Sequence, residues 1–270
     1  MTDRPALRLL LVHAHPDDES IATAGTMAKA KALGHRVVLV IATRGEHGEP
    51  VPGVLEEDEP LSVRRTAETY ESARILGVDR VEFLGYVDSG MAGTATADEP
   101  WTFAQTPVDQ AAARLALVLG EERADVLTTY DDNGGYGHPD HIQVHRVGRR
   151  AGELAEVPRR YMATMNRDFI MELISSRMAE SDVDLGDAEA PEIDEENFGQ
   201  PASVITHRID VTEHIAEKRA SMRAHASQIS DAHFFLALPD DAFAVSFGQE
   251  WFIAEGSTGG GEPFATDLFA

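Results

Sequence analysis

Short apolar runs alternate with helical patterns along the first part of the chain, and this alternation constrains the fold more than any other feature. An apolar run at 7–12 is followed by a helical pattern at 20–33, which Gly34 ends, and by a second apolar run at 36–42. Strand, helix and strand in this order form a βαβ unit with two parallel strands. The sequence therefore predicts an α/β fold: a Rossmann-like, mostly parallel sheet with helices on both faces.

The same alternation continues to about residue 165 and weakens beyond it. Further helices are expected at 61–76, 107–122, 141–154 and 211–228, and further strands at 81–84, 126–130, 161–165 and 204–209. We find no second domain, so residues 1–270 are expected to form a single unit. Within it, 180–203 is expected to be an acidic loop and 256–270 a flexible tail, because nine carboxylates crowd 180–196 and glycines crowd 256–261. The sequence leaves open whether the acidic loop is merely solvated or covers a site.

Charge and composition exclude several classes of function. The chain has 47 acidic and 23 basic residues, a formal net charge of -24, so it repels nucleic acid and anionic membranes. It has no cysteine, which leaves His, Asp and Glu as metal ligands. We recognise neither a signal peptide nor a segment long enough to span a membrane. A cytoplasmic protein with a small-molecule partner is expected, and a homo-oligomer is compatible with the sequence.

Ionisable residues crowd the chain directly after two of the expected strands. Segment 12–20 reads VHAHPDDES, and segment 131–141, after the strand at 126–130, reads DDNGGYGHPDH. Buried charges are costly unless they are paired or hold an ion. Because ligands bind at the carboxyl ends of parallel strands, the two segments are expected to face one another.

Imidazoles and carboxylates in these segments suit Zn²⁺ or a similar metal. His15 and Asp18, three residues apart, can hold one ion, and His141 at the start of the later helix supplies a third ligand. Three protein ligands leave a position open, as in catalytic sites. Two alternatives remain: the aspartates are ordinary helix caps, or His141 pairs with His145 one turn later.

Both segments resemble the motifs of the LmbE-like (PIG-L) family of zinc-dependent N-deacetylases, and most of all its mycothiol-pathway members. Smaller likenesses lie at 45–49, 65–68, 88–93 and 136–138. The resemblance implies that His15, Asp18 and His141 bind one Zn²⁺ per chain, with Fe²⁺ or Co²⁺ as alternatives. It also implies that Asp17 is the general base for the attacking water.

The resemblance implies roles for three further residues near the second motif. His138 donates to the oxyanion or to the leaving amine, Asp140 holds the imidazole of His138 in the required tautomer, and Tyr136 assists at the oxyanion. Substrate contacts are expected from Arg65, Glu49 and Asp88. The alternative for Arg65 is an ordinary ion pair with Glu68 or Glu71 on the helix surface.

Other histidines are expected to be structural: His13 supports the metal site, and His225 with Gln228 belongs to the scaffold. By its resemblance the chain deacetylates an N-acetyl amino sugar or small glycoconjugate, such as an N-acetylglucosaminyl-inositol. Regions 94–106 and beyond 167 match less well, which leaves two alternatives: an amidase for a larger acyl group on a thiol or glycoside conjugate, and a non-catalytic sugar-binding relative. A nucleotide-binding protein is disfavoured, because no G-x-G-x-x-G follows the first strand.

Overall fold

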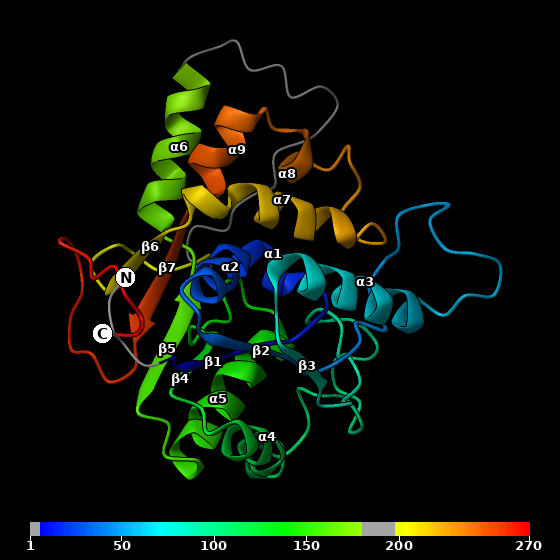
Figure 1. Ribbon diagram of the computed structural model, residues 1–270. Coiled ribbons are helices and arrows are strands. Elements are labelled where there is room, and N and C mark those ends of the chain that lie inside the picture. The colour runs from blue at the N-terminus through cyan, green and yellow to red at the C-terminus, as the bar shows by residue number, and fades with distance from the viewer. Residues whose placement is uncertain (1–5, 180–197) are drawn as a thin grey trace.

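The computed structural model describes residues 6–179 and 198–270, and within them seven strands form one sheet in the order β3-β2-β1-β4-β5-β7-β6 (Figure 1). The strands are β1 (Arg8–His13), β2 (Arg36–Ile41), β3 (Arg80–Phe83), β4 (Val126–Tyr130), β5 (Arg159–Thr164), β6 (His207–Asp210) and β7 (Gln249–Ala254). The first five are parallel, whereas β7 pairs antiparallel with both β5 and β6. The prediction of a mostly parallel α/β sheet is confirmed. The strand order reverses between β1 and β4, the position where such sheets bind ligands.

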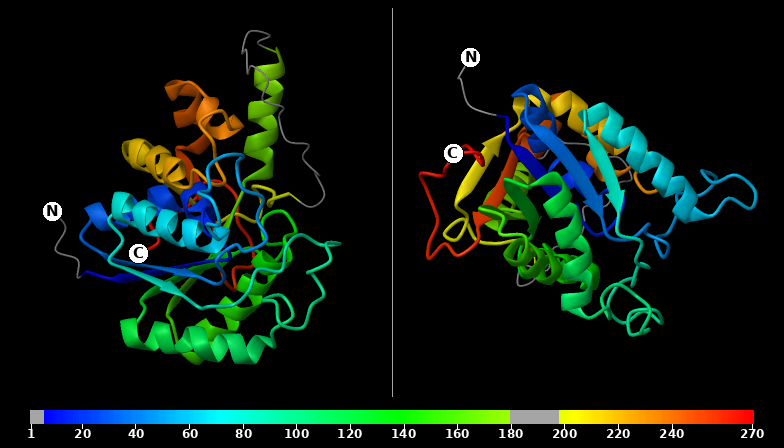
Figure 2. Two further views of the ribbon diagram at one scale, coloured as in Figure 1. Left: turned by 90° about the vertical axis from the view of Figure 1, so that its right-hand side faces the viewer. Right: turned by 60° about the horizontal axis from the view of Figure 1, so that its bottom comes forward.

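Helices cover both faces of the sheet, as predicted (Figures 1 and 2). They are α1 (Asp18–Ala22), α2 (Ala24–Ala32), α3 (Leu61–Leu76), α4 (Val108–Glu122), α5 (Pro139–Leu154), α6 (Arg167–Ala179), α7 (Ile215–Ala224), α8 (Phe234–Ala237) and α9 (Asp240–Phe247), with a 3-10 turn η1 (Thr212–His214). In Figure 1, α4 and α5 lie below the sheet, and α1, α2, α3 and α7 lie above it. None of the helices in the described parts is long and apolar enough to cross a membrane.

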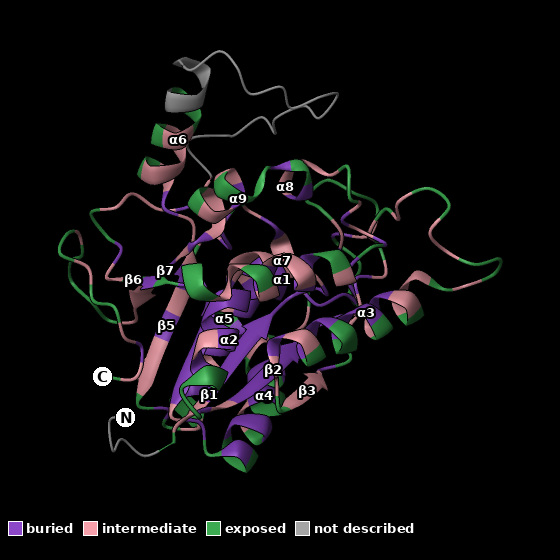
Figure 3. Ribbon diagram, turned by 45° about the horizontal axis from the view of Figure 1, so that its top comes forward, coloured by how far each residue is buried: buried purple, intermediate pink, exposed green. Residues whose placement is uncertain are grey.

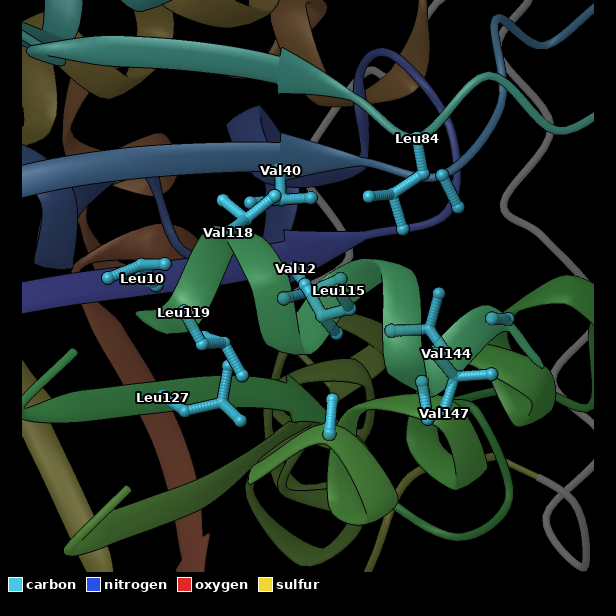
Figure 4. Close-up of a cluster of buried hydrophobic side chains, with 14 of the residues drawn as sticks. Leu10, Val12, Val40, Leu84, Leu115, Val118, Leu119, Leu127, Val144 and Val147 are labelled. Atoms are coloured by element: carbon cyan, nitrogen blue, oxygen red, sulfur yellow. The ribbon is translucent and has the colours of Figure 1, made fainter. Parts of the chain in front are cut away.

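Two apolar cores lie on opposite faces of the sheet because successive strand residues point to opposite sides. Leu10 and Val12 of β1 pack with residues of α4 and α5 (Figure 4), whereas Leu9 and Leu11 pack toward α2. The central strands are buried on both sides, as the purple ribbon in Figure 3 shows. This rigid centre holds the loops at the strand ends in place.

The helix predicted at 20–33 is wrong in one respect: it is two helices, which meet at Thr23. The side chain of Glu250 in β7 accepts hydrogen bonds from the backbone N–H groups of Gly25 and Thr26, 2.9 and 2.8 Å away, and so caps the second helix. A Cβ on Gly25 would lie 2.4 Å from the Cβ of Val211, so glycine permits this close approach. The break between the two helices thus depends on a contact between residues 225 positions apart, and the local apolar pattern gives no sign of it.

The second half of the chain departs further from the predicted elements. The helix predicted at 211–228 is the turn η1 followed by α7, and the strand predicted at 204–209 begins only at His207. The end of the segment predicted to be a flexible tail packs on the body of the protein, where Leu268 is buried and Phe269 stacks on His35 with ring centroids 4.0 Å apart. Of the acidic loop predicted at 180–203, residues 180–197 lie outside the described residues.

Candidate active site

Four loops meet at the carboxyl ends of the parallel strands, beside the reversal of strand order. They follow β1, β2, β3 and β4 and surround a cavity of about 310 Å³. Its lining includes His15, Asp17, Asp18, Glu49, Arg65, Asp88, Tyr136, His138 and Gln228. Asp140 and His141 are almost fully buried beside His15, so every residue that the sequence singled out for the site lies in this region.

The three predicted metal ligands form a nearly equilateral triangle of donor atoms. Nδ1 of His15 lies 3.4 Å from Oδ2 of Asp18, and Nε2 of His141 lies 3.4 Å from the same oxygen. The two ring nitrogens are 3.3 Å apart. A tetrahedral Zn²⁺ with ligands at about 2.0–2.1 Å has ligand–ligand edges of about 3.3–3.4 Å. The spacing of the donors therefore fits one tetrahedral metal ion.

The neighbours of each imidazole direct a lone pair into this triangle. Nδ1 of His141 lies 3.1 Å from the carbonyl oxygen of Gly134, and Nε2 of His15 lies 3.2 Å from Oδ2 of Asp140. Each of these nitrogens carries a proton and donates it. In a neutral ring the other nitrogen, Nδ1 of His15 or Nε2 of His141, has no proton, and this nitrogen faces Asp18. Three electron-pair donors that face one another repel unless a cation lies between them.

The carboxylates around His15 also favour a cation at this position. Burial lowers the pKa of His15, but hydrogen bonds to Asp140, Asp18 and Asp88 outweigh burial and hold this pKa well above its ordinary value. Burial raises the pKa of Asp18, but the charges and hydrogen bonds of His141 and His15 outweigh burial and hold this pKa well below the usual range. The site thus combines excess negative charge with converging lone pairs, which a proton or a metal ion neutralises.

Two wider groups of potential ligands share His15: one with His138 and His141, the other with Asp88 and Asp140. In each group the ligand atoms lie within 4.8 Å of one another. The triangle completed by Asp18 is tighter than this limit. We therefore take the triangle as the candidate ligand set and treat the other residues as its surroundings.

Asp17 adjoins the triangle but faces a different partner. Its Oδ2 lies 3.3 Å from Nη2 of Arg65. Burial raises the pKa of Asp17 to about 6, although Arg65 opposes the increase. The backbone φ of Asp17 is 97°, in the left-handed region that non-glycine residues rarely adopt. This strained backbone conformation costs free energy, and it places the carboxylate beside the cavity.

Arg65 is buried, so the alternative of a helix-surface ion pair is wrong. Its guanidinium donates to the carbonyl oxygens of Gly45, at 3.0 Å, and of Pro16. A Cβ on Gly45 would lie 2.1 Å from Nη1 of Arg65, which explains a glycine there. The neighbouring Arg64 makes the surface ion pair, with Glu59. Arg65 therefore joins the loops after β1 and β2 at the wall of the cavity.

His138 and Asp140 are close together, but their contacts differ from the prediction. The backbone N–H of Asp140 donates to Nδ1 of His138 at 3.1 Å, so the neutral ring carries its proton on Nε2. The Asp140 carboxylate instead contacts His15 and accepts hydrogen bonds from the N–H and the hydroxyl of Ser89. Burial, with His15 and His141 nearby, lowers the pKa of His138 to about 4. The backbone of Asp140 fixes the tautomer, and its side chain orients His15.

The predicted substrate-contacting residues occupy different positions around the cavity. Glu49 is exposed at its edge, whereas Asp88 is buried and accepts from the N–H groups of His47 and Gly90 at 3.1 and 2.8 Å. Oδ1 of Asp88 also lies 3.4 Å from Nε2 of His15, so much of its hydrogen-bonding capacity is already used. Tyr136 lines the cavity and is 45% exposed. Glu49 and Tyr136 are therefore the more accessible of these groups.

His13 and His145 support the site from outside the triangle. His13 lies 3.1 Å from the hydroxyl of Tyr130, whose ring stacks on His141 at 4.3 Å between centroids. Nδ1 of His145 lies 3.1 Å from the carbonyl oxygen of Tyr130, so His145 faces the backbone and not the donor triangle. Among the described residues no candidate metal group includes His145.

Sequence reasoning missed several residues that position the site. Ser89 holds Asp140, and Glu19 lies behind Asp17, where its Oε1 is 2.6 Å from Nε2 of His225, a residue expected only to belong to the scaffold. Glu19 completes the motif HPDDE, which was a signal for its importance, but its partner lies 206 residues away. Trp101, 52% exposed, lies close to the cavity residue His47, with ring centroids 6.4 Å apart.

Converging lone pairs beside an open cavity, with a further carboxylate next to them, are the arrangement of a hydrolase that works with a bound metal ion. The sequence profile of one family, described as GlcNAc-PI de-N-acetylase (PIG-L), matches residues 10–152. The chain belongs to this family, and the resemblance stated from its motifs is confirmed.

Relatives and solved structures place the chain further. It is 42% identical to the 1D-myo-inositol 2-acetamido-2-deoxy-alpha-D-glucopyranoside deacetylase of Acidothermus cellulolyticus, over 97% of this chain and 94% of the relative. The N,N'-diacetylchitobiose deacetylase from Pyrococcus horikoshii has a similar fold, with TM-score 0.55, 22% identity and coverage of 92% of this chain and 84% of that chain. So has the 4-carboxy-2-hydroxymuconate hydratase from Pseudomonas putida KT2440, with TM-score 0.62, 17% identity and coverage of 93% and 97%. Because a hydratase shares this fold, the reaction has to be argued from the site.

Proposed function

We propose that the protein hydrolyses the N-acetyl amide of an acetylated amino sugar carried on a small polyol, of the N-acetylglucosaminyl-inositol kind. The donor triangle of His15, Asp18 and His141, with Asp17 beside it at the same cavity, is the observation that carries this proposal. The name of the relative that is 42% identical over nearly the whole chain supports the substrate class.

The triangle would hold one divalent ion, for which Zn²⁺ is the best match because two imidazoles and one carboxylate suit its preferences. Fe²⁺ and Co²⁺ accept the same ligands. Such an ion supplies a Lewis acid for the amide carbonyl and makes a water molecule more acidic. Asp140 keeps His15 in the tautomer that this role requires.

The residues of the chain supply the proton transfers. Asp17 removes a proton from the attacking water, whose oxygen forms a bond to the carbonyl carbon. His138, with its proton on Nε2, donates a hydrogen bond to the carbonyl oxygen as negative charge develops there, and Tyr136 lies at the same cavity. The C–N bond then breaks, and the amine nitrogen takes up the proton that Asp17 removed. The products are acetate and the free amino sugar.

Sugar hydroxyl groups need hydrogen-bond acceptors and donors around the same cavity. Glu49 is exposed there and suits this role best. Asp88 and Arg65 line the cavity too, but both are engaged with the protein, so we assign them contacts with substrate only through the atoms that face the cavity.

The test combines metal content with release of amine. Purified protein is loaded with Zn²⁺, Fe²⁺ or Co²⁺ and assayed on N-acetylated amino sugars, with and without a chelator, next to amides that carry a larger acyl group. The proposal expects one metal per chain and chelator-sensitive release of acetate. Metal without release from any acetylated sugar would refute it, and faster release of the larger acyl group would favour an amidase.

Neighbouring carboxylates provide a matched pair of variants. We expect Asp18→Asn to lower the metal content, because it removes a charged donor from the triangle. We expect Asp17→Asn to keep one metal per chain and to lower kcat by about 10²- to 10⁴-fold, the usual worth of a general base. If Asp17→Asn loses its metal as readily as Asp18→Asn does, this division of roles is incorrect.

A further inference from the structure

A fully buried carboxylate connects Asp17 to the C-terminal half of the chain. Glu19 is 0% exposed, and its Oε2 accepts a hydrogen bond from the backbone N–H of Asp17 at 3.0 Å. Its Oε1 accepts from the hydroxyl of Ser72 in α3 and lies 2.6 Å from Nε2 of His225. One oxygen of Glu19 thus holds the backbone of Asp17, and the other is held by two separate elements.

The backbone of Asp17 needs such support. Its φ of 97° is unfavourable for a residue with a Cβ and persists only where its surroundings impose it. On the carboxyl side, the carbonyl oxygen of Asp17 accepts from the N–H and the hydroxyl of Ser20, at 2.9 and 2.7 Å. On the amino side, the bond to Glu19 fixes the N–H group. Together these contacts set the direction in which the Asp17 side chain leaves the backbone.

His225 is anchored independently of the motif that it supports. It follows the last residue of α7, which packs against α1 and α3 (Figure 3). Its own N–H donates to the carbonyl oxygen of Met222, and Ser227, two residues further on, donates twice to the carboxylate of Glu68 in α3. Within the described residues, Nδ1 of His225 has no hydrogen-bond partner, so the polar contact of the ring is the one with Glu19.

We infer that His225 is a positioning residue: through Glu19 it holds the Asp17 backbone, and hence the Asp17 carboxylate, in the orientation needed to accept a proton. This inference rests on the proposed hydrolysis, in which Asp17 is the base. A residue that acts on the base in this way affects turnover more than the binding of substrate or metal. A residue that merely ties α7 to α1 would affect folding alone.

Two amide substitutions separate these roles, because they differ only in reach. The side-chain nitrogen of Gln occupies the position of Nε2 of histidine and can still donate to Glu19, whereas that of Asn occupies the position of Nδ1 and cannot. We expect His225→Asn to lower kcat by about 10- to 100-fold, the range found for residues that orient a site, at unchanged KM and one metal per chain. His225→Gln should recover most of the loss.

His35→Asn serves as the control, since it also removes a buried imidazole, one that stacks on Phe269 beyond the other end of β1, with ring centroids 4.0 Å apart. It should lower thermal stability without a change of kcat.

The inference is overturned if folded His225→Asn turns over like the wild type, if His225→Gln is as slow as His225→Asn, or if the loss of kcat follows a loss of metal. If His225→Asn does not fold, Ser72→Ala removes the other donor to Oε1 of Glu19: lower kcat at constant KM supports the inference, and wild-type kcat overturns it. Wild-type protein that binds metal but releases no amine would instead refute the proposed function.

Discussion

The substitution Lys218→Met tests a buried ion pair that joins α7 to the sheet. Nζ of Lys218 lies 2.6 Å from Oε1 of Glu250, and the two residues are 1% and 2% exposed. Removing one partner of such a pair costs about 3–5 kcal/mol, since a charge stays buried without its counterion. Here Glu250 keeps two backbone N–H donors at the start of α2, which stabilise its charge. We therefore expect a loss near the lower limit, about 3 kcal/mol of unfolding free energy.

The control is Lys31→Met, the same change at the exposed ion pair with Asp79, where the lysine side chain is 42% exposed. An exposed pair contributes about 0–1 kcal/mol. Urea denaturation at pH 7 measures both variants and can be followed by tryptophan fluorescence, to which the buried Trp251 next to Glu250 contributes. Similar losses in the two variants, or a loss below about 1 kcal/mol for Lys218→Met, would refute the reasoning from burial.

Two further predictions concern the opposite end of the sheet and the rim of the cavity. Hydrogen bonds from Arg36, and then from Arg80, lower the pKa of Glu122 from its ordinary 4.5 to about 2. Because this pKa is lower in the folded state than in the unfolded state, the charged carboxylate stabilises the folded protein above pH 4.5. Glu122→Gln should therefore lower the free energy of unfolding by about 1–2 kcal/mol at pH 7. Denaturation at a series of pH values should show the difference between variant and wild type decreasing from pH 4.5 toward pH 2. Trp101→Ala should raise KM about three- to tenfold for a substrate with a second ring and leave KM for a single acetylated sugar unchanged, because the exposed indole offers a face for ring packing outside the cavity. Equal KM changes for both substrates would contradict this role.

The parallel half of the fold was predictable because its information is local. α3 and β4 begin and end at the predicted residues, where an apolar period stops at a glycine or a polar turn. By contrast, β7 was not predicted. Its sequence, QEWFIA, carries Glu250 at a core position, and only the distant Lys218 and the start of α2 make that charge acceptable. When the partner of a buried charge is remote in the sequence, the charge alone suggests an exposed loop and not a buried strand.

The candidate site divides in the same way. That His15, Asp18 and His141 lie close together was predictable, because the carboxyl ends of parallel strands meet at one edge of the sheet. The orientation of the His15 ring was not, since it depends on the Asp140 carboxylate, which Ser89 holds, and these contacts leave no periodic pattern. Asp140 illustrates the difference: its position was expected, but its carboxylate serves His15 and its N–H serves His138.

The profile of the family ends at residue 152, whereas His225 and Gln228 come from beyond it. The first half therefore contains the donor triangle and the proposed base, and the second half supplies the segment after α7, in which His225 contacts Glu19 and Gln228 lines the cavity. A chain with the same donor atoms but a different C-terminal half would keep the affinity for metal and lose the control over the direction of Asp17. Because orientation of the base determines rate far more than it determines metal binding, metal content alone is a poor indicator of activity among such chains. Turnover in the matched His225 variants, at constant metal content, measures what the second half contributes.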